Sequence, residues 1–231
     1  VVSGAEGDAR KVIREAAEEK GSEFRQVGER VERTGSRSME LEMEVAGEVV
    51  GTNLVGRYQV DNVDTVLEMV EALPLELEDD DVRRGIGSAV VEGRMEPVSR
   101  EPLVLLDGAH NPAAVDRLPE TLEEVDGGRT ISVVSVMEDK DYGEMVSTIE
   151  GFSDLLVFSE ASIERASDAA ELASCAEGTE SEVRPSIEEA IESAVGSASP
   201  EDTVLFTGSL YFVGDVKKVL EEDGNLQSML S

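Results

Sequence analysis

Five short apolar runs that alternate with helical segments constrain the fold of this chain more than any other feature. They begin after about residue 95, and each is followed by a stretch whose apolar residues have helical spacing. The runs are Leu103–Leu106, Ile131–Val136, Leu155–Ser159, the neighbours of Val183, and Val204–Thr207; the helical stretches are 113–124, 141–150, 166–176, 186–196 and 210–222. Strands this uniformly apolar are typical of a parallel sheet covered on both faces. We therefore predict an α/β, Rossmann-like domain with a mostly parallel sheet.

The first 92 residues have a different pattern of apolar residues. Helices are expected at 8–20, ended by Gly21, at 60–73, stopped by Pro74, and at 81–91 after three aspartates. Between the first two helices, Met39, Leu41, Met43 and Val45 alternate with glutamates, which indicates a strand with one wet face. A turn at Gly47 and a partner strand through Val49–Val50 and Leu54–Val55 should follow. We divide the chain into 1–92 and 93–231.

The charge balance narrows the possible partners. The chain has 52 acidic and 20 basic residues, a net charge of −32, and only five of the basic residues are lysines. A field of this sign repels nucleic acid and anionic membranes, so neither is expected as a partner. Disorder is the alternative reading of such a balance, and the periodic apolar residues argue against it. We instead hypothesise a folded protein adapted to high salt, in which surface carboxylates are screened.

The cysteine content and the apolar runs bear on disulfides and on location. The single cysteine, Cys175, rules out an internal disulfide and is expected to be a buried small side chain. No signal peptide and no apolar run of membrane-spanning length is present, so a cytoplasmic location is expected.

Three polar clusters follow the predicted strands. They are Asp107–Asn111, Met137–Asp141 and Thr207–Ser209, and the carboxyl ends of parallel strands are where open α/β sheets bind ligands. Asp107 could accept hydrogen bonds from ribose hydroxyls, and His110, the only histidine, could contact a phosphate. The alternative is a capped strand-to-helix turn in which Asp107 accepts only backbone N–H groups.

The string Asp107-Gly108-Ala109-His110-Asn111-Pro112 is similar to the C-terminal-domain signature of the folylpolyglutamate and dihydrofolate synthase family of the Mur ligase superfamily. Five other blocks resemble that family in its own order and carry the resemblance over most of residues 50–220. They are GRYQVDN at 56–62, GRME at 93–96, MEDKD at 137–141, ERA at 164–166 and TGSLYFVG at 207–214. The resemblance implies a Rossmann-like C-terminal domain at 93–231, preceded at 1–92 by the end of an α/β central ATPase domain.

The resemblance also implies roles for particular residues. Asn62 would bind the adenine or its neighbouring phosphate, Arg94 the nucleotide phosphates, and Asp107 the ribose. His110 would approach the phosphates and act in catalysis. The alternatives are a surface polar residue at Asn62 and a linker salt bridge at Arg94. Tyr58 stands where the family usually has His, which puts in doubt any role that needs an imidazole there.

Two more residues would bind the second substrate. Lys140 and Ser209 are the candidates for the carboxylate of the incoming glutamate, with Lys140 also counted as catalytic. The alternative for Lys140 is an ordinary exposed loop lysine.

The reaction implied is an ATP-dependent ligation of glutamate to folate. Phosphorylation of a carboxylate on the folate's glutamyl tail gives an acyl phosphate, which the glutamate amine attacks. ATP, L-glutamate and folate are the expected partners, Mg²⁺ is the expected metal, and a monomer is expected. Addition of glutamate to folate and formation of dihydrofolate from dihydropteroate are both compatible with the sequence.

One family element has no counterpart here. No Gly-Lys-Ser or Gly-Lys-Thr phosphate loop follows a strand, because Lys20-Gly21-Ser22 comes after a helix and Gly51-Thr52-Asn53 continues without the lysine. The family's metal ligands are also expected upstream of this chain, so we assign no metal ligand in it. We therefore expect a C-terminal fragment that needs an N-terminal ATPase portion and is inactive alone.

Three other functions could account for parts of this pattern. Another Mur-type amide ligase is a close variant, and a non-catalytic nucleotide-binding or regulatory module is the alternative from another class. A dehydrogenase is disfavoured because no Gly-x-Gly-x-x-Gly follows the first strand of the α/β domain.

Overall fold

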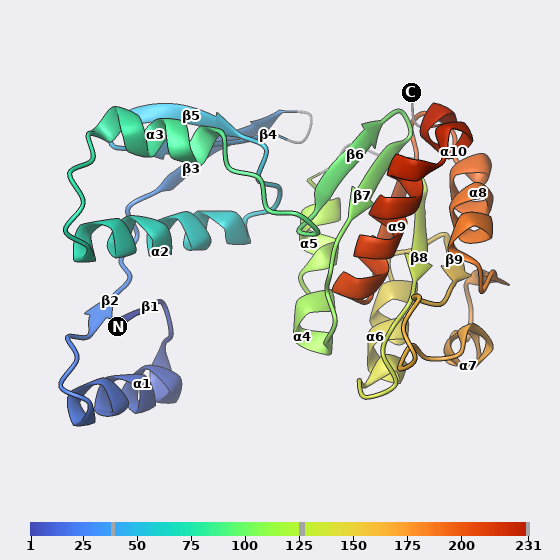
Figure 1. Cartoon of the computed structure of the whole chain (residues 1–231), viewed down its shortest axis with the longest axis horizontal. Helices are drawn as coiled ribbons and strands as arrows, with labels where there is room; N and C mark the ends of the chain where they lie inside the picture. Colours follow the sequence, from blue (N-terminus) through green and yellow to red (C-terminus); the bar gives the residue numbers. More distant parts are fainter. Residues whose placement is uncertain (38–39, 125–127, 230–231) are drawn as a thin grey trace. The chain divides into compact units, whose positions relative to one another are not determined.

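The chain folds into two units, Val1–Val90 and Val91–Ser231, which are described separately (Figure 1). The computed structural model describes residues 1–37, 40–124 and 128–229. The boundary between the units lies close to residue 92, where the pattern of apolar residues in the sequence changes. All polar clusters predicted at the strand ends lie in the second unit.

A six-stranded sheet forms the centre of the second unit, with the order β10-β9-β8-β11-β7-β6. All neighbouring pairs are parallel except β6 and β7, so the predicted α/β fold with a mostly parallel sheet is confirmed. The strands are β6 (Glu96–Arg100), β7 (Leu103–Leu106), β8 (Thr130–Val134), β9 (Leu155–Phe158), β10 (Glu180–Val183) and β11 (Thr203–Thr207). The antiparallel edge strand β6 was not predicted.

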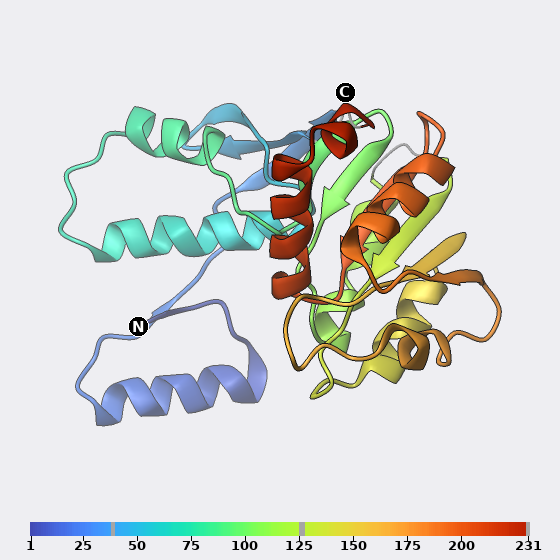
Figure 2. The ribbon, with the colours of Figure 1, turned by 45° about the vertical axis from the view of Figure 1, so that its right-hand side comes forward.

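Helices cover both faces of this sheet (Figures 1 and 2). They are α4 (Pro112–Val115), α5 (Leu118–Leu122), α6 (Tyr142–Glu150), α7 (Ala169–Ala173), α8 (Ile187–Ser197), α9 (Leu210–Glu222) and α10 (Gly224–Met229). The single helix predicted at 113–124 is thus two short helices, α7 is shorter than predicted, and α10 was missed. None of the helices described in either unit combines the length and apolar character that crossing a membrane requires.

The strand register explains why the apolar runs are continuous. Val104, Val133 and Phe206 point into one core cluster, which also contains the buried residues of α8 and α9. Their chain neighbours Leu105 and Val134 point to the opposite face and are also fully buried. Both faces are therefore dry, as expected for a parallel sheet between two helical layers.

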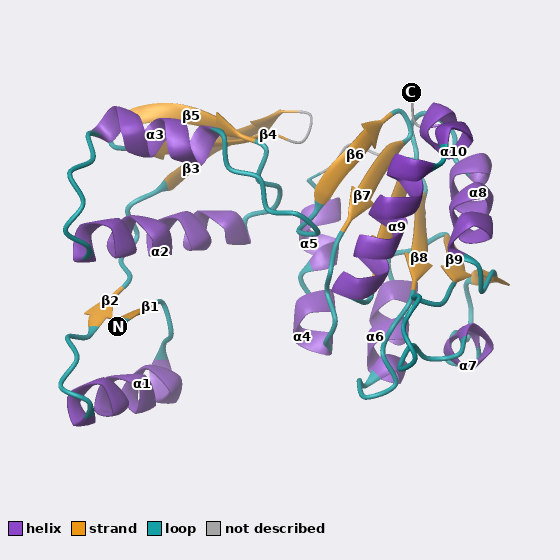
Figure 3. Cartoon of the chain, viewed as in Figure 1, coloured by secondary structure: helices purple, strands orange, loops and turns teal. Residues whose placement is uncertain are grey.

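The first unit contains a three-stranded antiparallel sheet, a two-stranded parallel sheet and three helices (Figure 3). Its elements are β1 (Val2–Ser3), α1 (Gly7–Glu19), β2 (Arg25–Gln26), β3 (Glu32–Arg37), β4 (Glu40–Val45), β5 (Glu48–Thr52), α2 (Tyr58–Ala72) and α3 (Asp79–Gly87). Leu41, Met43 and Val45 all point into its core, as the alternating pattern predicted. Met39, predicted to extend that strand, lies outside the described residues.

Three details of the first unit differ from prediction. The partner strand of β4 ends at Thr52, so Leu54–Val55 lies in the loop that follows, where both side chains are buried. The third helix starts at Asp79 and ends at Gly87, four residues earlier than expected. Val66 has the helical spacing of an apolar face together with Val63, Leu67 and Val70, which predicts a buried side chain, but it is 47% exposed.

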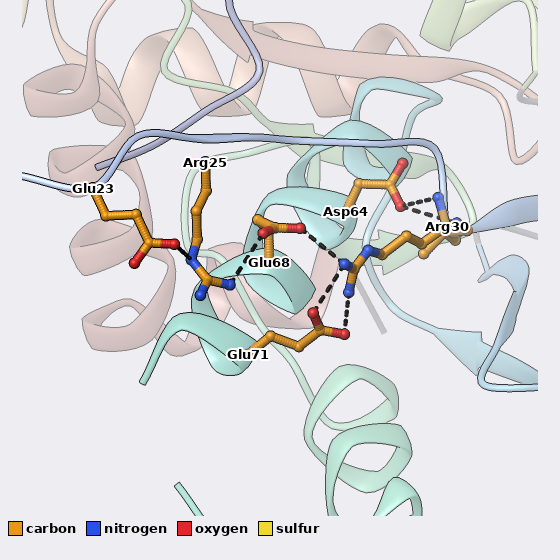
Figure 4. Close-up of polar contacts among 7 residues, drawn as sticks. Glu23, Arg25, Arg30, Asp64, Glu68 and Glu71 are labelled. Carbon is orange, nitrogen blue, oxygen red and sulfur yellow. Dashed lines mark hydrogen bonds and ion pairs between the residues drawn. The ribbon is translucent and has the colours of Figure 1, made fainter. Parts of the chain in front are cut away.

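The buried residues of α2 include two carboxylates, Asp64 and Glu68, besides the core residue Val63 (Figure 4). Asp64 Oδ1 accepts the backbone N–H groups of Arg30 and Val31, both at 2.9 Å. Glu68, one turn further on, pairs with the guanidinium groups of Arg30 at 2.9 Å and Arg25 at 3.6 Å. These contacts fasten β2 and the segment before β3 onto the helix.

Candidate functional site

The predicted site lies at one end of three neighbouring strands. In the sheet β11 lies between β8 and β7 and is parallel to both, so the loops that follow the three strands leave at the same edge. Backbone hydrogen bonds continue past the strands, from Asp107 N to Phe206 O at 2.9 Å and from Ser135 N to Thr207 O at 3.1 Å. The strand ends are therefore tied together where the polar residues begin.

Asp107 directly follows β7 and is almost fully buried, with 5% of its surface exposed. Its Oδ2 accepts the N–H of Met95 at 2.9 Å, and its Oδ1 accepts the N–H of Ala109 at 2.8 Å. Burial raises the pKa of Asp107, although both hydrogen bonds and the nearby charges of Arg94 and His110 act in the opposite direction. The backbone contacts of the alternative interpretation are thus present. They use one lone pair on each oxygen and leave a second on each.

Gly108 lies close against the side chains of Arg94 and Leu210. Its N–H donates to Gly93 O at 2.8 Å, and a Cβ at Gly108 would lie 2.8 Å from Arg94 Nη1 and 2.2 Å from Leu210 Cδ2. Arg94 also donates to Gly93 O at 3.1 Å and is half-buried. A side chain at Gly108 would therefore push the side chains of Leu210 and Arg94 aside, so the glycine permits this close approach.

His110 is held by the same turn. Its Nδ1 lies 2.9 Å from Gly108 O, and because a carbonyl oxygen only accepts, the Nδ1–H is the donor. The Nε2 atom is thereby left as the nitrogen for any outside partner. Asn111 next to it caps α4 by accepting Ala114 N–H at 2.9 Å, with Pro112 at the first helical position.

Ser209 follows β11 and begins α9. The residue is buried, and its Oγ accepts Tyr211 N–H at 3.1 Å, which leaves the hydroxyl proton for another acceptor. Gly208 before it has φ = 109°, and a Cβ there would lie 2.4 Å from Ser135 O. Thr207 Oγ1 is buried without a hydrogen-bond partner. The loop is thus a tight turn set by its backbone, and it contains the polar side chains of Thr207 and Ser209.

Lys140 lies in the loop between β8 and α6. Its Nζ pairs with Asp139 Oδ2 at 3.0 Å, and its side chain is 33% exposed. The pair lowers the pKa of Asp139. Lys140 is therefore a loop lysine with a local carboxylate partner, and its role toward a ligand stays a prediction.

Asn62 lies in the first unit, near the start of α2, where its Nδ2 donates to Gln59 Oε1 at 2.8 Å. The side chain is exposed while Gln59 is buried. A groove of about 530 Å³ beside this helix start is lined by Arg33, Thr34, Gly35, Arg57 and Val60. A role for Asn62 together with the residues of the second unit stays a prediction.

The comparison with known families decides the classification. A profile of the Mur ligase glutamate ligase domain matches residues 93–210, which contain every strand end described above. The chain belongs to the Mur ligase family. The predicted resemblance to the folylpolyglutamate and dihydrofolate synthases is confirmed by its curated relatives.

Two of these Mur ligase relatives show the extent of the similarity. The chain is 35% identical over 182 residues to the dihydrofolate synthase/folylpolyglutamate synthase of Bacillus subtilis, over 75% of this chain and 42% of that protein. It is 35% identical over 168 residues to a probable bifunctional folylpolyglutamate synthase/dihydropteroate synthase of Halobacterium salinarum, over 71% of this chain and 20% of that protein. The chain therefore spans less than half the length of these relatives.

Solved Mur ligase structures agree with this classification. The Mycobacterium tuberculosis folylpolyglutamate synthase complexed with ADP superposes with a TM-score of 0.82 at 25% identity, over 96% of this chain and 55% of that one. Escherichia coli FolC in complex with DHPP and ADP superposes with a TM-score of 0.77 at 26% identity, over 91% of this chain and 50% of that one.

Two residues bonded to the turn at Gly93 were not predicted as site residues from the sequence. Glu96 accepts Gly93 N–H at 2.8 Å, and Lys217, on α9, pairs with Glu96 at 2.8 Å. Glu96 stood inside the Gly-Arg-x-Glu block, whereas Lys217 is more than 100 positions away and carried no signal. In residues 1–37, 40–124 and 128–229, no group of three or more His, Cys, Asp or Glu side chains could hold a metal ion.

Proposed function

We propose that this chain is the nucleotide-facing C-terminal portion of an ATP-dependent ligase that adds glutamate to folate through an acyl phosphate. In this proposal the enzyme is a folylpolyglutamate synthase, and formation of dihydrofolate from dihydropteroate is a second activity compatible with the same site. ATP, L-glutamate and folate are its partners. Relatives solved with ADP support the nucleotide, and one of them also holds DHPP.

The observation that carries the proposal is the grouping of Arg94, Asp107 and His110 around Gly108. A permanent cation, a buried carboxylate with spare lone pairs and a free imidazole nitrogen form one cluster at the strand end, within a molecule of net charge −32. Phosphate oxygens are matched by a guanidinium, and vicinal ribose hydroxyls by a carboxylate. A surface with this much negative charge would otherwise repel a nucleotide.

Each residue has one task in this scheme. Asp107 accepts hydrogen bonds from the ribose, Arg94 pairs with phosphate oxygens, and His110 donates from protonated Nε2 to a phosphate as negative charge builds on it. Lys140 and Ser209 bind the carboxylate of the incoming glutamate, by charge and by the free hydroxyl proton respectively. Asn62 contacts the adenine or its neighbouring phosphate from the first unit.

The scheme also assigns what this chain does not supply. Residues 1–92 are the end of the central ATPase domain, so the phosphate loop and Mg²⁺ ligands belong to an N-terminal portion. Within residues 1–37, 40–124 and 128–229, no group of three or more His, Cys, Asp or Glu side chains could hold a metal ion, and the proposal assigns no Mg²⁺ ligand to them. The chain alone is therefore inactive as a ligase.

Titration of ADP into the chain by calorimetry tests the nucleotide assignment. Replacing Arg94 with Ala should weaken ADP binding about tenfold, because a charge-assisted contact to phosphate is lost. The exposed Arg117 of the same unit is the matched control, and Arg117→Ala should leave the affinity unchanged. Equal affinities for the two variants, or no ADP binding by the unaltered chain, would count against the proposal.

A further inference from the structure

The segment that leads into β6 is a turn with two residues in the left-handed region. Gly93 has φ = 63° and Met95 has φ = 48°, and the Met95 side chain is fully buried. A non-glycine residue adopts this conformation only where its surroundings hold it there. Contacts around residues 92–96 must therefore hold this turn in place.

A carboxylate and an ammonium group supply those contacts. One oxygen of Glu96 accepts Gly93 N–H at 2.8 Å, and the other pairs with Lys217 Nζ at 2.8 Å. Lys217 also pairs with Glu92 at 3.1 Å, so it joins both ends of the turn. The Glu96 side chain is only 12% exposed, and its hydrogen bond raises the pKa of Lys217, so the cation is retained.

The 92–96 turn also positions the backbone atoms that bond to Arg94, Asp107 and Gly108. Gly93 O accepts hydrogen bonds from Gly108 N–H at 2.8 Å and from Arg94 Nη1 at 3.1 Å. Met95 N–H donates to Asp107 Oδ2 at 2.9 Å. The same few atoms thus orient the guanidinium of Arg94 and the carboxylate of Asp107.

We infer that Glu96 and Lys217 are positioning residues, which hold the 92–96 turn so that Arg94 and Asp107 face the nucleotide. This rests on the proposed function, since the ligand of Arg94 and Asp107 is the nucleotide assigned there. Neither Glu96 nor Lys217 touches the nucleotide. Their effect is transmitted through Gly93 O and Met95 N–H.

Two disruptive variants, one control and one conservative replacement test the inference. Lys217→Met and Glu96→Gln each remove one partner of the pair, and Lys218→Met removes an exposed lysine from the next position of the same helix. Lys217→Arg keeps the cation and serves as the conservative rescue. Each protein is compared by amide hydrogen exchange, by NMR titration of the Asp107 carboxyl carbon, and by ADP calorimetry.

The pKa of Asp107 separates positioning from simple charge effects. If the turn loosens, Asp107 loses the Met95 hydrogen bond, and its pKa rises in both Lys217→Met and Glu96→Gln. A purely long-range effect moves the pKa in opposite directions, because one variant removes a positive charge and the other a negative one. We also expect the amides of Met95 and Gly108 to exchange about tenfold faster, and ADP to bind about tenfold more weakly, in both variants.

Two results would overturn the inference. One is exchange at Met95 and Gly108 equal to that of Lys218→Met, and the other is opposite shifts of the Asp107 pKa in the two variants. If the unaltered chain does not bind ADP, the proposed function fails. The exchange and pKa measurements still decide whether Glu96 and Lys217 position Asp107.

Discussion

Asp202 shows how a single buried carboxylate organises the end of the sheet opposite the candidate site. It lies just before β11 and accepts hydrogen bonds from Ser199 N at 2.9 Å, Arg129 N at 2.8 Å and Arg129 Nη2 at 3.0 Å. Burial alone would raise the pKa of Asp202, but these donors outweigh it, and the pKa lies below its usual value. The ionised carboxylate therefore stabilises the native state.

Replacing Asp202 with Asn should lower the free energy of unfolding by about 1–3 kcal/mol at neutral pH, since hydrogen bonds to a buried charged group are weakened. A pKa depressed by folding gives stability that is present above the unfolded-state pKa and is lost as pH falls through the folded-state pKa. The difference between the two proteins should therefore shrink in acid. Urea unfolding of both proteins across pH measures this difference in unfolding free energy. A difference that stays constant into the acid range would show that the ionised Asp202 carboxylate does not stabilise the native state.

The residues of the candidate site were predicted because of their local strings, and their mutual geometry was not. Asp107 and His110 stood out as a polar group after an apolar run, and both lie where that run ends. Lys217 could not be found, because its partners Glu92 and Glu96 come from a distant part of the chain. Long-range pairs of this kind depend on the packing of α9, which no local pattern contains.

At the scale of elements, α2 is held to the preceding segment by polar contacts on its buried face. Asp64→Ala would leave the N–H groups of Arg30 and Val31 without their acceptor, at a cost of about 1–3 kcal/mol in unfolding free energy. Glu71→Gln on the same helix is the control, because Glu71 is 56% exposed and its pair with Arg30 is screened by solvent. Thermal unfolding should rank Asp64→Ala well below Glu71→Gln; equal melting temperatures would contradict this reading.

The elements themselves were predictable where apolar spacing was regular. The strands β7, β9 and β11 and the helices α6, α8 and α9 agree with their predicted ranges to within about a residue. Edge elements were missed: β3 has no apolar side chain among Glu32–Arg37, and β6 contains one valine and a proline. Their pairing is decided by the neighbouring strand, so their own residues carry little signal.

At the scale of the whole molecule, the charge of −32 is the dominant electrostatic term. We propose that the fold is adapted to concentrated salt, in which the Debye length falls from about 30 Å at 0.01 M to about 3 Å at 1 M. Repulsion among surface carboxylates then largely disappears. The melting temperature should therefore rise clearly between millimolar and molar KCl.

A sucrose series of matched osmolality is the control, since sucrose stabilises by exclusion from the surface and does not screen charge. A rise in KCl well beyond that in sucrose supports screening. An identical melting temperature in millimolar and molar KCl would rule out the adaptation.

The central claim is that this chain forms one side of an ATP-dependent glutamate ligase and needs an N-terminal ATPase portion to act. The most direct test is release of ADP that depends on both folate and glutamate, measured in parallel on the 231-residue chain and on the complete gene product that contains it. We predict ADP release and lengthening of the folate by a glutamyl residue in the complete product, and neither in the chain alone. Ligation by the chain alone, or a complete product whose ADP release ignores folate and glutamate, would contradict the account.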